Sequence, residues 1–91
     1  MTVRIRIPAN LREFTERQGT VEVNGSQVNE ALQSLIEAYP GLREKLLASD
    51  GQLQSFINLF VGDRSVRELE GLATELSPGA TLLIVSALAG G

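Results

Sequence analysis

The 91-residue sequence contains no cysteine and no histidine. Without cysteine the chain can form no disulfide, cannot use a thiolate as nucleophile and cannot build a cysteine-ligated metal site. Without histidine it lacks the commonest general base and the commonest metal ligand. Serine hydroxyls are present, but no imidazole is available to activate them. The composition therefore argues against a catalytic centre of the usual kinds, and we predict no metal site.

Long apolar runs and an excess of positive charge are also missing. No stretch approaches the roughly 20 apolar residues of a membrane-spanning helix. Residues 1–7 carry two arginines in an alternating pattern instead of the apolar run of a signal peptide. The net charge of −3, with arginines interleaved among acidic residues, argues against nucleic-acid binding. We predict a cytoplasmic protein that binds neither membranes nor nucleic acid.

What is present fits one small globular domain. Hydrophobic residues make up 43% of the chain and charged residues 21%, close to globular averages. A chain of this length can bury one core, and two domains would not fit. Alternation of apolar and polar side chains is typical of strands with one buried face. It predicts four strands, over residues 3–7, 20–23, 55–61 and 81–86.

Between the second and third predicted strands, the spacing of apolar side chains changes from the period of a strand to that of a helix. Apolar side chains recur at one helical stripe: Val28, Ala31, Leu32, Leu35, Ile36 and Tyr39. Pro40-Gly41 predicts where this helix ends. We also expect a further helical turn or two over residues 42–47, a short edge strand over residues 64–69, and a loop with a helical turn over residues 71–76.

One helix stripe and one sheet face must bury each other, which predicts a two-layer α+β domain. We expect Val28, Leu32, Leu35 and Ile36 of the helix to pack on Val3, Ile5, Ile57, Leu59, Leu82 and Ile84 of the sheet. The opposite face then carries apolar side chains that nothing in this chain covers, and such patches often mark interfaces. We predict a partner interface formed by Phe60, Leu83 and Val85 with Arg4 and Arg6 alongside.

The end of the sequence passes from an apolar strand directly into Gly90-Gly91. Terminal residues usually fray and carry no chemistry. Glycine, which has no Cβ, can enter narrow slots in extended conformations and leaves the terminal carboxylate open to attack. The dipeptide alone is compatible with an inert end as well as with a reactive one.

Five ordered segments together resemble the ubiquitin-like sulfur carriers of the MoaD/ThiS group. They are Arg6-Ile7-Pro8 with Leu11-Arg12, Asn58-Leu59-Phe60-Val61, Val66-Arg67, Gly71-Leu72-Ala73-Thr74 and Ala87-Leu88-Ala89-Gly90-Gly91. The resemblance covers nearly the full chain, and the three middle segments favour the cysteine-biosynthesis carrier over the shorter thiamine type. Many members of this group have a proline before the tail, where this sequence has Ser86-Ala87.

The resemblance implies a β-grasp fold with a mixed sheet of four to five strands and one main helix. It implies a single domain over residues 1–91, with residues 87–91 as a flexible tail, and a carrier instead of an enzyme. Gly91 would be adenylated by an E1-like activating enzyme of the MoeB/ThiF type that uses ATP, so the carrier itself binds no cofactor. A sulfurtransferase or sulfide source would convert it to a thiocarboxylate, and the tail residues Ala87, Leu88, Ala89 and Gly90 would carry it to an acceptor synthase.

Three alternatives remain open at this stage. The chain could be the small non-catalytic subunit of a molybdopterin-type synthase. It could be a protein modifier that forms an isopeptide bond through Gly91, because both fates share the activated carboxylate. It could also be an interaction module with an inert tail.

Overall fold

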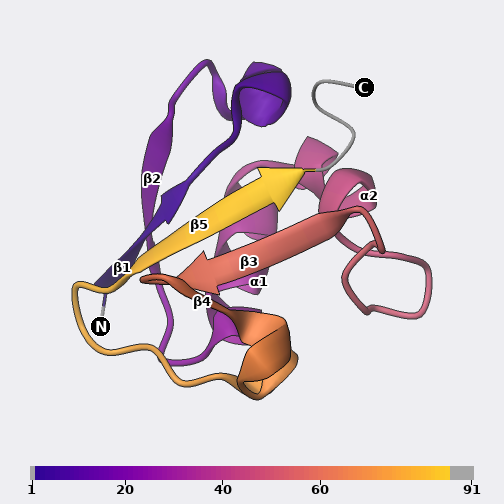
Figure 1. Ribbon diagram of the computed structural model, residues 1–91. Helices are drawn as coiled ribbons and strands as arrows, with labels where there is room; N and C mark the ends of the chain where they lie inside the picture. Colours follow the sequence, from indigo (N-terminus) through magenta and orange to yellow (C-terminus); the bar gives the residue numbers. More distant parts are fainter. Residues whose placement is uncertain (1, 87–91) are drawn as a thin grey trace.

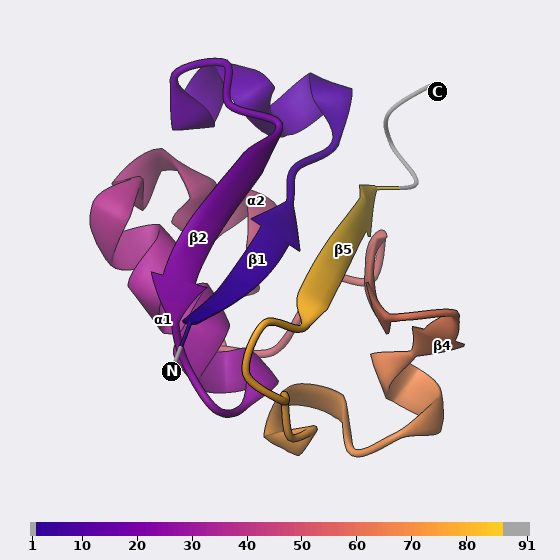
Figure 2. The ribbon, with the colours of Figure 1, turned by 90° about the vertical axis from the view of Figure 1, so that its left-hand side faces the viewer.

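The computed structural model describes residues 2–86, which form one five-stranded sheet with a main helix packed on one face (Figures 1 and 2). The strands are β1 Thr2–Arg6, β2 Thr20–Asn24, β3 Ile57–Val61, β4 Arg64–Ser65 and β5 Thr81–Ser86. The α-helices are α1 Val28–Ala38 and α2 Arg43–Leu46. The 3-10 helices are η1 Ala9–Thr15, η2 Pro40–Leu42, η3 Val66–Glu68 and η4 Gly71–Ala73. The predicted tail, residues 87–91, lies outside the described residues.

The sheet is mixed, with strand order β2-β1-β5-β3-β4. β1 and β2, the first two predicted strands, pair as an antiparallel hairpin in which Val3 lies opposite Val23. β5 occupies the centre of the sheet, parallel to β1 on one side and antiparallel to β3 on the other (Figure 1). The predicted α+β fold is confirmed, because one mixed sheet and one main helix form its two layers.

The main helix follows the predicted apolar stripe. Val28, Ala31, Leu32, Leu35 and Ile36 are all buried. Its first turn is held by Glu30, whose Oε1 accepts hydrogen bonds from the Ser26 backbone N–H and the Ser26 hydroxyl, both at 2.8 Å. The helix ends at Ala38, before Pro40. Proline at the start of η2 cannot continue the hydrogen-bond ladder of the preceding helix.

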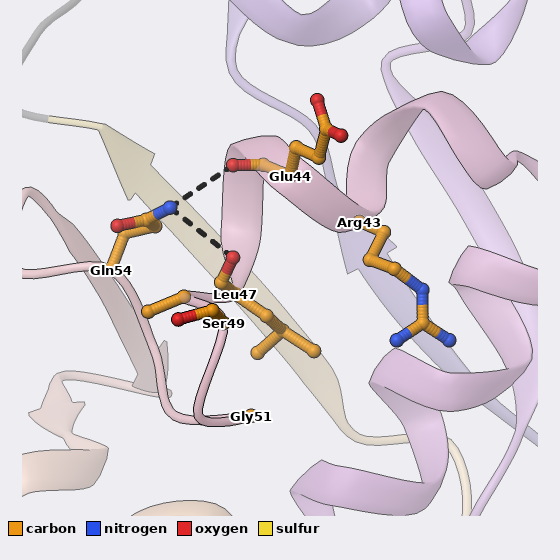
Figure 3. A pocket seen from close by; sticks show the side chains of 7 residues that line it. Arg43, Glu44, Leu47, Ser49, Gly51 and Gln54 are labelled. Atoms are coloured by element: carbon orange, nitrogen blue, oxygen red, sulfur yellow. Dashed lines mark hydrogen bonds between the residues drawn. The ribbon is translucent and has the colours of Figure 1, made fainter.

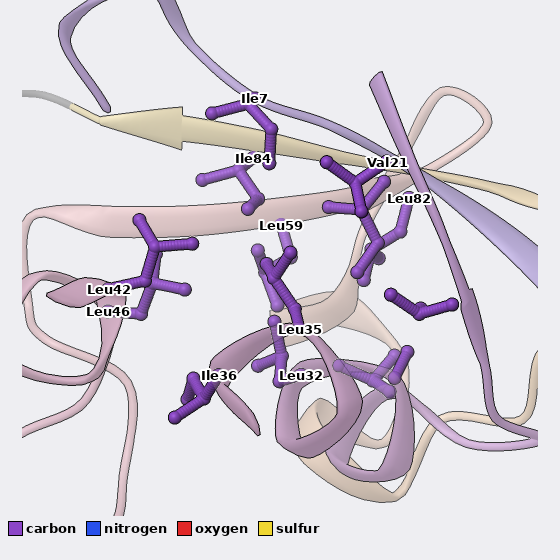
Figure 4. Packing of buried hydrophobic residues seen from close by; sticks show 14 of the residues in the cluster. Ile7, Val21, Leu32, Leu35, Ile36, Leu42, Leu46, Leu59, Leu82 and Ile84 are labelled. Carbon is purple, nitrogen blue, oxygen red and sulfur yellow. The ribbon is translucent and has the colours of Figure 1, made fainter. Parts of the chain in front are cut away.

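The predicted packing of helix on sheet is confirmed by one continuous buried cluster (Figure 4). Each of the ten predicted residues belongs to it: Val3, Ile5, Val28, Leu32, Leu35, Ile36, Ile57, Leu59, Leu82 and Ile84. Leu42 and Leu46 extend the cluster beyond the end of α1, in line with the helical turns expected over residues 42–47. Burial of apolar area in this cluster is the main stabilising contribution to the fold.

Two predicted strands were wrong by two residues or more at one end, whereas the bounds of the others differ by at most one residue. The strand expected over residues 64–69 ends at Ser65, because the Ser65 hydroxyl accepts from the Arg67 backbone N–H and starts η3. Val66 is fully buried, so the chain turns from the sheet edge toward the core. The strand expected from residue 55 begins only at Ile57, whose N–H donates to the Gln54 carbonyl and closes a turn.

Candidate functional site: the outer face of the sheet and the base of the tail

We call the sheet face turned away from α1 the outer face. Strand register places four residues in one row across it: Arg6 opposite Leu83, Leu83 opposite Phe60, and Phe60 opposite Ser65. Leu83 and Val85 are each 39% exposed, and they are the exposed large hydrophobic side chains among residues 2–86. Phe60 is half-buried beside them. The register therefore brings together Phe60, Leu83 and Val85, the three apolar residues of the predicted interface.

Arginines line the β1 side of this apolar strip. Arg6 lies directly opposite Leu83, and Arg4, two residues earlier on β1, lies opposite Thr81. The Arg4 Nε atom is 3.7 Å from a carboxylate oxygen of Glu22, and both side chains are more than 60% exposed. An exposed pair of this kind stabilises the fold very little. Both arginines adjoin the apolar strip as predicted, while docking of a partner there stays a prediction.

The β3 side of the strip contains a pocket of about 310 Å³. Phe60, Val85 and Arg67 line it together with residues 55–58. The Arg67 Nη2 atom donates to the Ile57 carbonyl oxygen at 2.7 Å, which lays the guanidinium along the edge of β3. Our interface prediction missed Arg67. The available signal was the Val66-Arg67 pair, which entered the sequence analysis only through a family resemblance.

A side-chain network explains why Arg67 takes this position. The Asn58 Oδ1 atom accepts from the Leu59 N–H at 2.8 Å and from the Ser65 hydroxyl at 2.9 Å. The same Ser65 hydroxyl accepts from the Arg67 N–H at 3.2 Å. β4 is only two residues long, so side chains satisfy the backbone groups of β3 that β4 does not reach. This closes a strand edge that could otherwise pair with another chain.

Ser86 ends β5 and is the last described residue before the tail. It lies opposite Ile57 of β3, and its hydroxyl oxygen is 3.5 Å from the Asn10 Nδ2 atom. The pairing of β5 with β1 covers only Thr81 to Leu83, so the point from which the tail leaves is held by β3. The proposed functional residues Ala87, Leu88, Ala89, Gly90 and Gly91 lie outside the described residues, and their predicted roles stay predictions.

A separate pocket of about 400 Å³ lies between α2 and the loop that follows it (Figure 3). Arg43, Glu44, Ser49 and Gln54 contribute its polar side chains. The Gln54 Nε2 atom donates to the carbonyl oxygens of Glu44 and Leu47, at 3.1 and 3.2 Å. The amide of Gln54 is therefore occupied in holding the loop closed, and we assign no ligand to this pocket.

The described part of the chain contains no group of three or more Asp or Glu residues that could hold a metal ion. Over the same residues, no helix is both long and apolar enough to cross a membrane.

Comparison with known proteins identifies the group to which this arrangement belongs. The family model of the ThiS family matches residues 5–91. The chain therefore belongs to the ThiS family, the MoaD/ThiS group of ubiquitin-like sulfur carriers. Members of this family have the β-grasp fold, and the mixed sheet with its main helix described above is that fold.

Individual ThiS-family relatives match along their full length. The sulfur carrier protein CysO of Mycobacterium tuberculosis is 37% identical over 93 residues, which span all of both chains. A putative sulfur carrier protein of Archaeoglobus fulgidus shows the same identity and coverage. Among solved structures, a chain of the Amycolatopsis orientalis BexX/CysO complex superposes with a TM-score of 0.90 at 36% identity, covering 98% of this chain and 99% of that one.

Proposed function

We propose that the protein is a sulfur carrier whose Gly91 carboxylate is adenylated and then converted to a thiocarboxylate. The observation that carries this proposal is the position of β5. The central strand of the sheet ends at Ser86, five residues before Gly91, and exposes Leu83 and Val85 on the outer face. A partner that docks on this face would therefore hold the tail at a defined distance from its own active site.

The chemistry requires a partner. A terminal carboxylate, with an ordinary pKa near 3.5, is ionised at neutral pH and is a poor electrophile. ATP supplies an adenylyl group that turns the carboxylate oxygen into a good leaving group. The sulfur of sulfide then attacks the Gly91 carbonyl carbon, the bond from that carbon to the phosphate oxygen breaks, and AMP leaves with a thiocarboxylate as the product. A sulfurtransferase persulfide would instead give an acyl disulfide, from which a second thiol of the sulfurtransferase would release the thiocarboxylate by forming a disulfide with the persulfide's inner sulfur. This chain has neither histidine nor cysteine for these steps. We assign the first step to an E1-like activating enzyme of the MoeB/ThiF type and the second to a sulfurtransferase or sulfide source.

The names of the relatives support one acceptor pathway over another. The CysO name of full-length relatives supports cysteine biosynthesis as the pathway that receives the sulfur. A synthase for molybdopterin is the next candidate. Either assignment makes the protein a carrier that is consumed and regenerated in the cytoplasm, with ATP bound by the activating partner and not by the carrier.

The outer face supplies the docking surface in this proposal. Leu83 and Val85 would enter an apolar depression of the activating enzyme, while Arg4 and Arg6 would contact its acidic rim. Buried apolar anchors with a polar rim are the usual anatomy of such interfaces. Phe60 widens the apolar strip toward the pocket near Arg67.

The tail carries the reactive end into the partner. At about 3.3 to 3.6 Å per extended residue, five residues span on the order of 17 Å. Gly90 and Gly91 would let the backbone approach the nucleotide where a Cβ would collide. Leu88 could contact the apolar mouth of the slot, and Ala87 and Ala89 keep the tail narrow.

Reconstitution tests the proposal directly. The purified protein is incubated with ATP, the cognate activating enzyme and a sulfide source, and its intact mass is recorded. We expect a mass increase that corresponds to the exchange of one oxygen for sulfur, located at Gly91 by fragmentation.

A Gly90→Trp variant provides the control, because it should retain the fold and lose sulfuration. Sulfuration of this variant at the parent rate, or absence of any exchange in the parent, would contradict the carrier function. Conjugates linked through Gly91 to other proteins, with no thiocarboxylate, would identify a protein modifier instead.

A further inference from the structure

The protein contains seven arginines but only one lysine, Lys45. The difference is important for a chain whose carboxyl end becomes activated. A guanidinium stays protonated and is not a nucleophile at neutral pH, whereas a lysine amine can attack an activated carbonyl once it loses its proton. Lys45 lies on α2 and is exposed. It is therefore the one side-chain amine that could react with the activated Gly91 of this protein.

Lys45 lies at the base of the tail. Lys45 and Ser86 line the same pocket, of about 320 Å³, together with residues of η1 and with Phe56. The Lys45 Nζ atom lies 5.5 Å from the centre of the Phe14 ring, a cation–π contact that holds the amine on this side of the molecule. The end of the central strand and the single lysine thus share one surface depression.

The geometry selects this amine over any at the start of the chain. β1 and β5 are parallel, and Arg4 lies opposite Thr81. Thr2 is therefore level with residue 79, two residues before β5 begins. Ser86 is thus seven residue steps along the sheet from Thr2, about 23 Å at 3.3 Å per residue. The five tail residues reach on the order of 17 Å. They can span the pocket that Ser86 shares with Lys45, whereas the level of Thr2 lies beyond their length.

We propose that Lys45 is the acceptor of an intramolecular isopeptide bond with Gly91 when the activated carboxyl end is not consumed by sulfur. The neutral Nζ atom attacks the Gly91 carbonyl carbon of the acyl adenylate, a carbon–nitrogen bond forms, the bond to the phosphate oxygen breaks and AMP leaves. The proton of the amine passes to solvent buffer. The product is a lactam that lacks one water relative to the free acid.

This reaction would make the carrier self-limiting. The cyclised chain has no free carboxyl end, so it can be neither adenylated again nor sulfurated. Two groups held near each other in one molecule react at a high effective concentration, which favours the intramolecular product over conjugation to other molecules at micromolar protein. The inference rests on the proposed function in one respect: the activating enzyme would have to form the adenylate at Gly91.

A preformed thioester tests the reaction without that enzyme. The full chain is made as an intein fusion and released with a small thiol as a Gly91 thioester, then incubated at mildly alkaline pH. We expect a monomer lighter than the free acid by one water, formed at a rate that does not change with protein concentration. Proteolysis and fragmentation should locate the new amide between Lys45 and Gly91.

Two variants control for the identity and position of the amine. Lys45→Arg keeps the charge and should reduce the lactam at least about tenfold, leaving slow hydrolysis to the acid. The double variant Lys45→Arg, Arg4→Lys restores the composition of the parent but moves the amine to the level of Thr81. That position lies about five residue steps, or roughly 17 Å, along the sheet from Ser86. The tail must therefore extend much farther to meet the relocated amine than to meet Lys45, and the lactam should form more slowly.

The outcomes separate clearly. Hydrolysis alone, dimers linked through Lys45, or equal lactam formation by the relocated amine would each overturn the inference. Because the thioester is made without ATP or a partner, such a failure would leave sulfuration by the activating enzyme untouched. Conversely, a Lys45 lactam formed from the thioester would stand even if reconstitution gave no thiocarboxylate.

Discussion

Leu83 of β5 lies directly opposite Phe60 of β3, on the outer face of the sheet. Leu83 is 39% exposed, although it lies in the central strand of the sheet. A large apolar side chain that remains exposed at the centre of a sheet contributes little to folding. Its position next to the base of the tail therefore makes it the most informative residue for testing docking.

We predict that Leu83→Asp weakens binding to the activating enzyme by at least about tenfold, because a charge would replace an apolar anchor at the centre of the interface. The thermal midpoint should change little, since the site is exposed. Binding is measured by calorimetry or by the protein concentration needed for half-maximal adenylation. Thr81→Asp is the matched control, because it adds the same charge to the same face of β5, two residues away. Equal affinity of Leu83→Asp and the parent would contradict docking on the outer face.

The core makes a second prediction. Leu35 is fully buried in the stripe of α1 that packs on the sheet. Leu35→Ala should lower the free energy of unfolding by about 2 to 5 kcal/mol, since it leaves a cavity in a packed core. Urea denaturation measures the change. Gln33→Ala, exposed on the same helix, should stay within about 0.5 kcal/mol of the parent. A loss below about 0.5 kcal/mol for Leu35→Ala would contradict the packing.

A third prediction concerns the closed edge of β3. Arg67→Ala removes the 2.7 Å hydrogen bond to the Ile57 carbonyl and should lower the free energy of unfolding by about 1 to 2 kcal/mol. It also leaves strand backbone uncovered, so aggregation on prolonged incubation should increase. Denaturation and light scattering measure the two effects. Arg64→Ala on β4 is the control with the same change of charge. Identical behaviour of the two variants would show that Arg67 does not protect the edge.

The fold was predictable because apolar side chains recur with a regular spacing in most of its helices and strands. The stripe of α1 and the alternation in β1, β2 and β5 depend on spacing alone, and the burial of each matches it. The segment after Asp63 has no such period. A single hydroxyl, that of Ser65, ends β4 and starts η3 there, and a hydrogen bond of this kind leaves no pattern in the sequence.

The candidate site was predictable only in part, for a related reason. Leu83, Val85 and Phe60 could be placed on one face, because alternation along a strand assigns each side chain to a side. The position of Arg67 depends instead on a contact with Ile57, ten residues earlier in the chain. Contacts between segments that the sheet brings together require the strand register, which the sequence pattern does not specify. The proximity of Lys45 to Ser86 is of the same kind.

The last prediction concerns the pH dependence of the first turn of α1. The Ser26 backbone N–H, and secondarily the Ser26 hydroxyl, donate to the Glu30 carboxylate and lower the pKa of Glu30 below its usual value. A carboxyl whose pKa is lower in the folded than in the unfolded state contributes stability above the unfolded pKa. That contribution is lost as the pH falls through the lower, folded value. Glu30→Gln should therefore have a lower thermal midpoint than the parent at neutral pH.

The difference in thermal midpoint between the parent and Glu30→Gln should shrink once the pH falls below the usual glutamate pKa. It should disappear when Glu30 of the folded parent is protonated. Thermal unfolding followed by circular dichroism across a pH series measures it. Glu37→Gln, an exposed change on the same helix, should show no such loss at neutral pH. A gap of constant size from neutral to acid pH would mean that the carboxylate charge at residue 30 does not stabilise the helix start.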